Sequence, residues 1–179
     1  FLWSREEILD KMPPLFGGGE MIQDVCEEKS TWAELPHKFE AGTPAIAEAI
    51  GLSEALKYIN KIGLKNIKSY ETELTKYLFE KLLLIKDLNI IGPNPEQDSQ
   101  RASLASFFIK DIHSNDIAEI LDSKGVCIRS GHHCCQPLHK YLNINSTARV
   151  SMNFTTTKED IDIFIEKLND TISFLRINS

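Results

Sequence analysis

The sequence predicts an α/β protein whose second half is a compact α+β layer. Two observations support this: apolar residues recur every three or four positions in some segments, and they alternate with polar residues in shorter ones. After residue 64 these segments follow one another as the strands and helices of one layered domain, without internal repeats. We expect a boundary at Gly63, which divides the 179 residues into a first domain, 1–63, and a second domain, 64–179.

The composition is that of an ordinary globular protein, and it excludes some classes of function. Lys and Arg number 20 against 26 Asp and Glu, and the net charge of −6 is scattered, so we expect no nucleic-acid-binding face. No apolar run reaches the roughly 18 residues of a membrane span, and no signal-peptide pattern is visible. The cysteines make a poor disulfide framework, so we expect a cytoplasmic protein; they are Cys26, Cys127, Cys134 and Cys135.

A short helix is predicted at residues 4–12. Ser4 is its expected N-cap, and the prolines at positions 13 and 14 end it. Three consecutive glycines follow at residues 17–19, where they indicate a tight turn or a flexible flap between short strands. As a phosphate-binding loop they lack the Gly-Lys-Ser/Thr ending of a P-loop. We therefore expect a mobile hairpin here.

A longer helix is predicted from Thr43 to Gly63. Thr43 is placed as its N-cap and Pro44 at its first position, where the missing N–H has no cost. The free amides and the hydroxyl of such a start also suit an anion, so Gly42 and Thr43 form either an anion site or a plain helix cap. The apolar residues at helical spacing are Ile46, Ala49, Ile50, Leu56 and Ile59.

The same two patterns continue through the second domain. They predict helices at residues 67–85, 117–124 and from 157 onward, and strands at residues 89–91, 103–109, 126–129 and 147–153. Ser114 is expected to cap the middle helix, and Gly125 to end it. Thr157 and Asp160 have the spacing of a capping box at the start of the last helix.

The segment RSGHHCC at residues 129–135 directly follows a predicted strand. A thiol is nucleophilic as its thiolate, and a neighbouring arginine or histidine favours that form, so Cys134 is a candidate reactive thiol. Two alternatives stay open: adjacent Cys and His could ligate a metal, and a buried cysteine can be a small apolar residue. In the strand 147–153, alternation places Arg149 on the face opposite to Ala148 and Val150.

Four segments, in this order, resemble those of one enzyme family: FGGGEMI at 16–22, PHKFEAGTP at 36–44, RSGHHC at 129–134 and ARVS at 148–151. Over essentially its whole length the chain resembles the C-terminal part of a SufS-type (group II) cysteine desulfurase. These enzymes are class V aminotransferases of the PLP-dependent fold type I. The resemblance implies that 1–63 is the end of the large α/β cofactor domain, with a hairpin lid. It implies that 64–179 is most of the small α+β domain that bears the cysteine.

The resemblance also implies an activity for the full enzyme. Such enzymes use pyridoxal 5'-phosphate to convert L-cysteine to L-alanine, and a cysteine thiolate takes the sulfur as a persulfide. By position that nucleophile is Cys134. Arg149 matches the arginine that binds the substrate carboxylate, a task suited to a planar two-pronged donor. Arg129 and His133 match further residues of the substrate-binding set.

The resemblance also implies a binding site for the cofactor phosphate and several partners. Thr43, with Gly42, matches the residue that bonds the cofactor phosphate of the partner subunit, which implies a homodimer. Family members pass the sulfur to a dedicated acceptor protein of the Suf type for iron–sulfur cluster assembly. We expect neither nucleic acid nor membrane as a partner, and no metal site.

Two departures from the family pattern matter. The lysine that carries the cofactor lies upstream of these motifs, and the chain starts at Phe1 as if at the end of a strand, so we expect a piece of a longer protein that is inactive by itself. Lys38 is not that lysine, because it belongs to the PHKFEAGTP motif. Cys135 stands where the family usually has a small residue. It could trap the persulfide, form a strained disulfide or be a bystander.

Two other classes of function stay open. A zinc-binding module would use Cys127, His132, His139 and one thiol of the 134–135 pair. However, no Cys-x-x-Cys pair exists, and adjacent residues of a strand point apart. A non-catalytic dimerisation or interaction domain would fold and dock without any chemistry.

Overall fold

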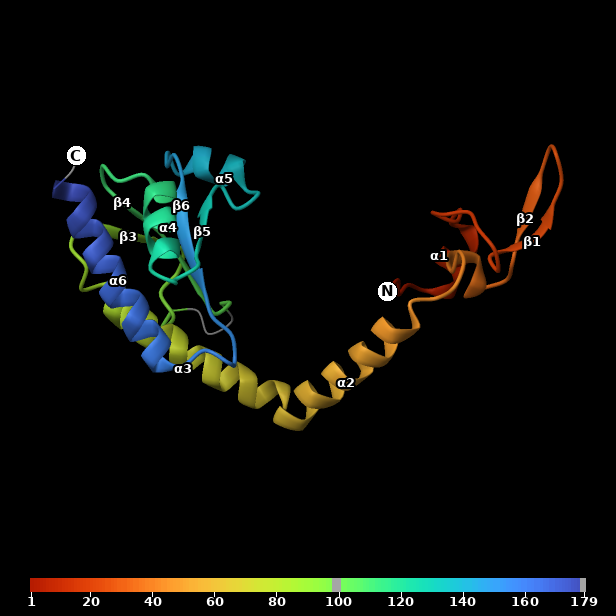
Figure 1. The fold of residues 1–179 in the computed structure, drawn as a ribbon, viewed down its shortest axis with the longest axis horizontal. Coiled ribbons are helices and arrows are strands. Elements are labelled where there is room, and N and C mark those ends of the chain that lie inside the picture. The colour runs from red at the N-terminus through yellow and green to blue at the C-terminus, as the bar shows by residue number, and fades with distance from the viewer. Residues whose placement is uncertain (98–100, 178–179) are drawn as a thin grey trace. The chain divides into compact units, whose positions relative to one another are not determined.

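The computed structural model describes residues 1–97 and 101–177. The chain divides into two compact units, Phe1–Lys61 and Ile62–Ser179. Both contain helices and antiparallel strands, so the predicted α/β class is confirmed (Figure 1). Within the described residues, no helix combines the length and the apolar character that crossing a membrane requires.

The first unit combines a two-stranded hairpin with helices. In chain order its elements are α1 (Glu6–Lys11), β1 (Ile22–Val25), β2 (Ser30–Trp32), the 3-10 helix η1 (His37–Phe39) and α2 (Ile46–Ile62). The two strands are antiparallel, and Ile22 pairs with Trp32. Met21 is fully buried, whereas α2 has no buried residue. The described part of this unit therefore has little hydrophobic core.

The glycines at residues 17–19 do not make the turn of the hairpin, contrary to the prediction, because they precede β1. The hairpin turns between Cys26 and Lys29, where the Cys26 amide donates to the Lys29 carbonyl over 2.9 Å. The glycine segment instead contacts the loop before α2, since the Gly42 amide donates to the Gly19 carbonyl over 2.8 Å. Glycine suits position 42 because its φ of 77° lies in the left-handed region.

Two predicted helix starts in this unit are wrong. Arg5, not Ser4, is the N-cap of α1, and no side chain caps that helix. The helix α2 begins after Ala45, whose carbonyl accepts a hydrogen bond from the Ala49 amide over 3.0 Å. Thr43 therefore lies in the loop before the helix, where its side chain is exposed and does not cap the helix.

The second unit is a four-stranded antiparallel sheet with four helices around it (Figure 1). In spatial order the strands are β3 (Leu88–Ile91), β4 (Leu104–Ile109), β6 (Thr147–Ser151) and β5 (Arg129–Gly131). The helices are α3 (Leu64–Leu82), α4 (Ser114–Ser123), α5 (Gln136–Tyr141) and α6 (Lys158–Ile177). Because β6 lies between β4 and β5, it brings together segments that are distant in sequence.

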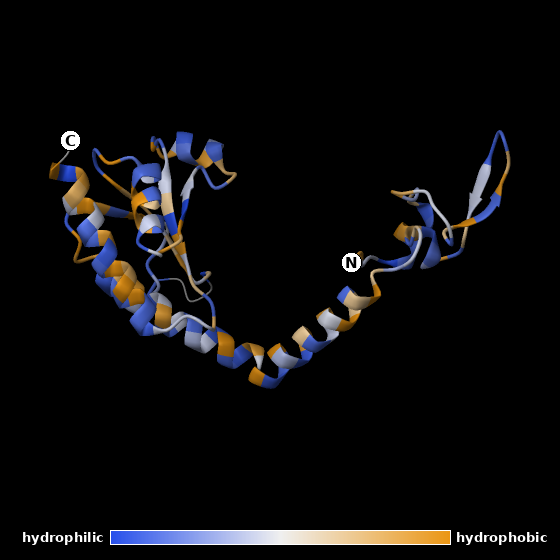
Figure 2. Ribbon diagram, in the orientation of Figure 1, coloured by the Kyte–Doolittle hydropathy of each residue, from blue (hydrophilic) through white to orange (hydrophobic). Residues whose placement is uncertain are grey.

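One face of this sheet carries the hydrophobic core. Alternate residues of β4, namely Ala105, Phe107 and Ile109, are buried against apolar side chains of α3, α4 and α6. Apolar and polar residues alternate along these helices, as amphipathic helices require (Figure 2). In α6 the buried apolar residues recur every three or four positions and so form one inward face: Ile161, Phe164, Leu168 and Ile172.

The capping box at the start of α6 is confirmed. The Asp160 amide donates to Thr157 Oγ1 over 3.1 Å, and the Thr157 amide donates to Asp160 Oδ2 over 2.8 Å. These reciprocal bonds satisfy backbone donors that the first turn of a helix leaves free. The hydrogen bond from the Thr157 backbone also holds the pKa of Asp160 below its usual value.

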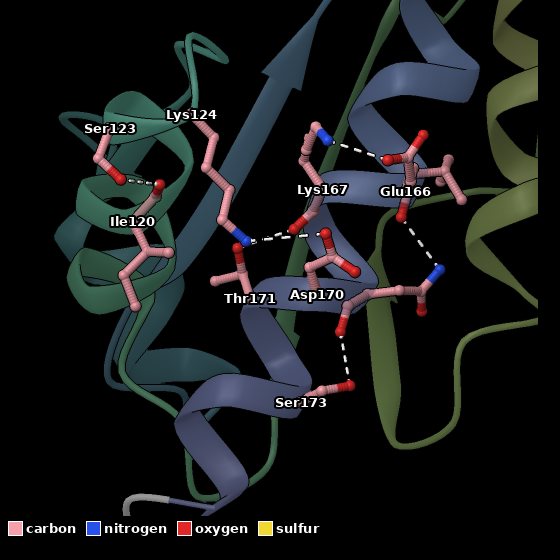
Figure 3. A network of polar contacts seen from close by, with 10 residues as sticks. Ile120, Ser123, Lys124, Glu166, Lys167, Asp170, Thr171 and Ser173 are labelled. Atoms are coloured by element: carbon pink, nitrogen blue, oxygen red, sulfur yellow. Dashed lines mark hydrogen bonds and ion pairs between the residues drawn. The ribbon is translucent and has the colours of Figure 1, made fainter.

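Helices α4 and α6 pack against each other. Lys124, just after α4, places its Nζ 3.9 Å from Asp170 Oδ2 of α6 (Figure 3).

The predicted N-cap of α4 was wrong by one residue. His113 is the N-cap, and its Nδ1 accepts a hydrogen bond from the Asn115 amide in the first turn. Ser114 is buried instead, and its Oγ donates to Ser146 Oγ over 2.7 Å.

The predicted strand 126–129 is also displaced. The strand β5 begins only at Arg129, where it pairs with Arg149 of β6. Val126 and Ile128 pack against the core, as their apolar character predicts, but they lie outside the ladder. The Val126 amide donates to the Leu121 carbonyl, which closes the end of α4.

Candidate functional site

The loop after β5 has an unusual backbone. Gly131 ends the strand with a φ of 107°, and two residues other than glycine follow in the left-handed region, His133 at 52° and Cys134 at 61°. Each costs on the order of 1 kcal/mol or more, and such strain concentrates at functional sites. The Cys135 amide donates to the His132 carbonyl over 2.9 Å and closes the turn. The loop leaves the Cys134 side chain exposed.

Cys134 has a cationic partner. Arg129 Nη2 donates to Cys134 Sγ over 3.3 Å. A guanidinium beside a sulfur stabilises negative charge on that sulfur, and the thiolate is the nucleophilic form. Exposure and this contact together suit Cys134 for attack on an incoming molecule.

Cys127 shows the opposite environment. Its Sγ donates to Asp122 Oδ1 over 3.3 Å, and that hydrogen bond raises the pKa of the Cys127 thiol. The carboxylate therefore keeps this exposed sulfur protonated and weakly nucleophilic. Of these two exposed thiols in the second unit, Cys134 is the one with an activating neighbour.

A second arginine lies across the ladder from the first. In the register of β5 and β6, Arg129 pairs with Arg149, and Gly131 with Thr147. The side chains of Arg149 and Thr147 share one face of β6, opposite to the face of buried Ala148. Like charges directly opposite each other repel, so this pair of arginines favours a bound anion between or beside them.

His133 completes this cluster. Its Nε2 donates to the Thr147 carbonyl over 3.1 Å, which leaves Nδ1 as the acceptor. Among the described residues, His133 Nδ1 and Arg149 Nε are buried side-chain atoms without a hydrogen-bond partner. Burial, with the positive charge of Arg149 as the next cause, lowers the pKa of His133. The ring is therefore neutral at pH 7, and the site offers one acceptor and one donor to a ligand.

The depressed pKa of His133 predicts a pH dependence of folding stability. Below the ordinary value of 6.5, the unfolded chain binds a proton at His133 that the folded chain binds only at lower pH. Stability from this residue is thus complete above pH 6.5 and is lost as pH falls through the folded-state pKa. We expect His133→Gln to lose less unfolding free energy on acidification than the wild type, measured by urea denaturation at several pH values. Equal losses would contradict the assignment.

A cavity of about 200 Å³ lies on the sheet face opposite the core. Apolar residues from the sheet and α5 form much of its wall, together with a few polar side chains. Its lining includes Leu104, Leu138, His133, Cys135, Thr147 and Arg149. A small cavity with mainly apolar walls and a few polar groups is typical of a site for a small molecule.

The sequence prediction missed Thr147 as a residue of the site and missed the structural role of His139. Thr147 accepts from His133 through its carbonyl, and its Oγ1 lies 3.1 Å from His139 Nε2. His139, considered above only as a zinc ligand, is nearly buried and supports the loop from α5. A sequence signal for Thr147 existed, since it lies two residues before Arg149 in an alternating strand and so shares its face.

The other predicted site residues lie in the first unit. Gly42 adopts a φ of 77°, and Thr43 follows it with an exposed side chain. Lys38 is nearly buried, and its Nζ donates to the Asp10 carbonyl over 2.7 Å. Within residues 1–97 and 101–177, no group of three or more His, Cys, Asp or Glu side chains is placed to hold a metal ion.

The fold and the site together are those of an α/β protein with a reactive thiol. An exposed cysteine, Cys134, lies on the loop after an edge strand of the antiparallel sheet, and the paired arginines Arg129 and Arg149 lie on the neighbouring strands. The sequence model described as "Aminotransferase class-V" matches residues 1–164. The chain therefore belongs to the aminotransferase class-V family.

Curated relatives carry a more specific name. A "Probable cysteine desulfurase" of Synechocystis sp. is 52% identical over 174 residues, which are 97% of this chain and 41% of the relative. Another, of Staphylococcus aureus, is 47% identical over 173 residues, again 97% of this chain and 41% of the relative. The chain thus spans 41% of the length of these relatives.

Solved structures agree in fold. The cysteine desulfurase CsdA (S-sulfonic acid) of Escherichia coli has a TM-score of 0.84 at 28% identity, over 96% of this chain and 42% of that one. The apo cysteine desulfurase of Thermococcus onnurineus NA1 has a TM-score of 0.82 at 36% identity, over 94% and 42%. A C-DES mutant with glycine covalently linked to its PLP cofactor matches in fold, with a TM-score of 0.70 at 20% identity, over 93% and 40%.

Proposed function

We propose that this chain is the C-terminal part of a SufS-type cysteine desulfurase, a sulfurtransferase that converts L-cysteine to L-alanine. In the complete enzyme, Cys134 captures the substrate sulfur as a persulfide. The observation that carries this proposal is the exposed Cys134 thiol, held on a strained loop with Arg129 Nη2 at 3.3 Å, beside a pocket that contains Arg149.

The pocket residues have separate tasks in this proposal. Arg149 binds the substrate carboxylate, because its buried Nε lacks a partner and a guanidinium matches a carboxylate in shape and charge. Arg129 stabilises the Cys134 thiolate before attack. His133, neutral at pH 7, accepts a hydrogen bond or a proton at Nδ1. The cavity of about 200 Å³ suits a small amino acid.

The complete enzyme also needs pyridoxal 5'-phosphate. When bound, this cofactor withdraws electrons from the substrate, which makes the α-proton acidic and the carbon–sulfur bond labile. Residues of this chain fit its phosphate: Thr43 offers an exposed hydroxyl, directly after a glycine in the left-handed region. We assign Thr43 and Gly42 to the phosphate of a partner subunit in a homodimer. The lysine that holds the cofactor then comes from another part of the complete protein.

The proposal extends to domain roles and to the fate of the sulfur. Residues 1–63 are assigned to the end of the large cofactor domain, and 64–179 to the small domain with the thiol loop. A persulfide on an exposed thiol can be attacked by another protein's thiolate. We therefore assign a Suf-type acceptor protein as the next carrier, for iron–sulfur cluster assembly in the cytoplasm.

The decisive experiment uses the complete protein with pyridoxal 5'-phosphate and L-cysteine. We expect one L-alanine for each sulfur removed, and a mass increase of about 32 Da, one sulfur atom, on Cys134 by peptide mass spectrometry. Residues 1–179 alone, treated in the same way, should form no L-alanine, because the cofactor lysine is missing. A sulfur adduct that still forms after Cys134→Ala would contradict the assignment of Cys134, and absence of L-alanine in the wild type would contradict the proposed activity.

A further inference from the structure

We propose that Cys135 is a second sulfur-accepting thiol, which takes the outer sulfur from the persulfide of Cys134. This inference rests on the proposed function, since it needs a persulfide at Cys134. The two neighbouring thiols have different surroundings. Cys134 is exposed, whereas Cys135 is half-buried and lines the cavity that also contains Arg149 and His133. Sulfur moved to Cys135 is therefore better shielded from solvent.

The Cys135 thiol lies beside a buried histidine. Its Sγ lies 3.8 Å from His139 Nδ1 and donates to the His132 carbonyl over 2.9 Å. His139 is 6% exposed, and its Nε2 lies 3.1 Å from Thr147 Oγ1. His139 Nδ1 also lies 3.3 Å from the Cys135 carbonyl, which can only accept, so Nδ1 carries the ring proton and Nε2 accepts from Thr147 Oγ1. The Nδ1–H therefore lies beside the Cys135 sulfur as a donor and favours negative charge on Sγ as the thiol proton leaves.

The transfer is a thiol–disulfide type of exchange and needs no added oxidant or reductant. The S–H bond of Cys135 breaks, and its proton goes to solvent. The Cys135 sulfur forms a bond to the outer sulfur of the Cys134 persulfide. The bond between that outer sulfur and Cys134 Sγ breaks, and its electron pair stays on Cys134. The products are a persulfide on Cys135, a thiolate on Cys134 and a proton in solvent.

The structure favours both the attack by Cys135 and the departure of the Cys134 thiolate. Adjacent residues replace a collision between two molecules by a step within one loop, which raises the effective concentration of the attacking thiol. The Cys134 thiolate that leaves lies beside Arg129 Nη2, the group that stabilises it before the first attack. Transfer thus returns Cys134 to its reactive form, and each site can store two sulfur atoms.

A burst experiment on the complete enzyme, with pyridoxal 5'-phosphate but without reductant or acceptor protein, tests this storage. After addition of L-cysteine, samples are quenched with an alkylating reagent, L-alanine is counted, and the sulfur is mapped by tandem mass spectrometry. The wild type should release about two L-alanine per site, with sulfur on both thiols. Cys135→Ala should release about one, with its sulfur on Cys134, so the burst is about halved.

Cys127→Ala is the matched control, because it removes an exposed thiol of the same unit and should leave the burst at the wild-type value. Cys134→Ala should carry no sulfur on Cys135, which is loaded only through Cys134. A wild-type burst of about one, with sulfur confined to Cys134, overturns the inference and leaves the proposed function intact. A disulfide between the two thiols with release of free sulfide also overturns it, since the inner sulfur was then attacked. Absence of L-alanine in the wild type overturns both proposals.

Discussion

Cys134→Ala is expected to lower the kcat of the complete enzyme by at least about a hundredfold, because it removes the atom that attacks the substrate sulfur. The KM for L-cysteine should change little, since the carboxylate contact belongs to Arg149. Cys135 is not expected to replace the missing thiol, because its Sγ is directed to the His132 carbonyl and lacks the arginine contact. Steady-state release of L-alanine in the presence of a reducing thiol measures this loss.

Measuring the stability of the same variant distinguishes a loss of catalysis from a loss of folding. Cys134 is exposed, and alanine keeps the Cβ atom that the strained backbone already accommodates, so the free energy of unfolding should stay within about 0.5 kcal/mol of the wild type. Cys127→Ala, at a thiol whose pKa is raised by Asp122, should retain the wild-type kcat. Retention of more than about a tenth of the rate by Cys134→Ala would mean that another thiol is the nucleophile.

Sequence alone could place three of the four helices of the second unit, α3, α4 and α6, but it missed α5 and misplaced the first residues of α3 and α4. The period of buried residues in α6 is visible without coordinates, and so is the capping box of Thr157 and Asp160. The start of α4 was not, because Ser114 is a preferred cap by residue type, yet its hydroxyl bonds to Ser146, 32 positions away. His113 then provides the capping acceptor. A distant contact thus outweighed a local preference.

The strand that precedes the thiol loop shows a related limit. Val126 and Ile128 alternate with other residues and are partly buried, so their pattern is that of a strand. A ladder, however, also needs a partner at the right register, and β6 provides one only from Arg129 onward. The hydrophobic pattern therefore identified the burial correctly and the hydrogen bonding incorrectly.

The candidate site, too, could be predicted only in part. Motif resemblance singled out Cys134, Arg129 and Arg149, and the structure places Arg129 in contact with Cys134 and opposite Arg149. Resemblance could not reveal that Thr147 joins two histidines, His133 through its carbonyl and His139 through its hydroxyl. Those contacts depend on the pairing of β5 with β6 and on the position of α5, which are tertiary features.

Arg149→Ala is expected to lower kcat/KM for L-cysteine by about a hundredfold, mainly through KM. Two charge-assisted hydrogen bonds to the carboxylate, at about 1.5 kcal/mol each, account for that factor. Stability should not fall comparably, because the variant also removes the repulsion between Arg149 and Arg129, which face each other across the ladder. Arg176→Ala, which breaks a surface pair with Asp87, is the matched control and should leave kcat/KM unchanged.

A substrate analogue can assign this loss to the carboxylate. Cysteamine keeps the thiol and the amine of L-cysteine but has no carboxylate, so as a competing ligand it should bind to the wild type and to Arg149→Ala about equally. Arg149→Lys should recover part of the affinity for L-cysteine, since it restores the charge but not the two-pronged geometry. If Arg149→Ala weakened cysteamine as much as L-cysteine, the arginine would be shaping the pocket instead of binding the carboxylate. The unpartnered Nε of Arg149 would then need a different ligand group.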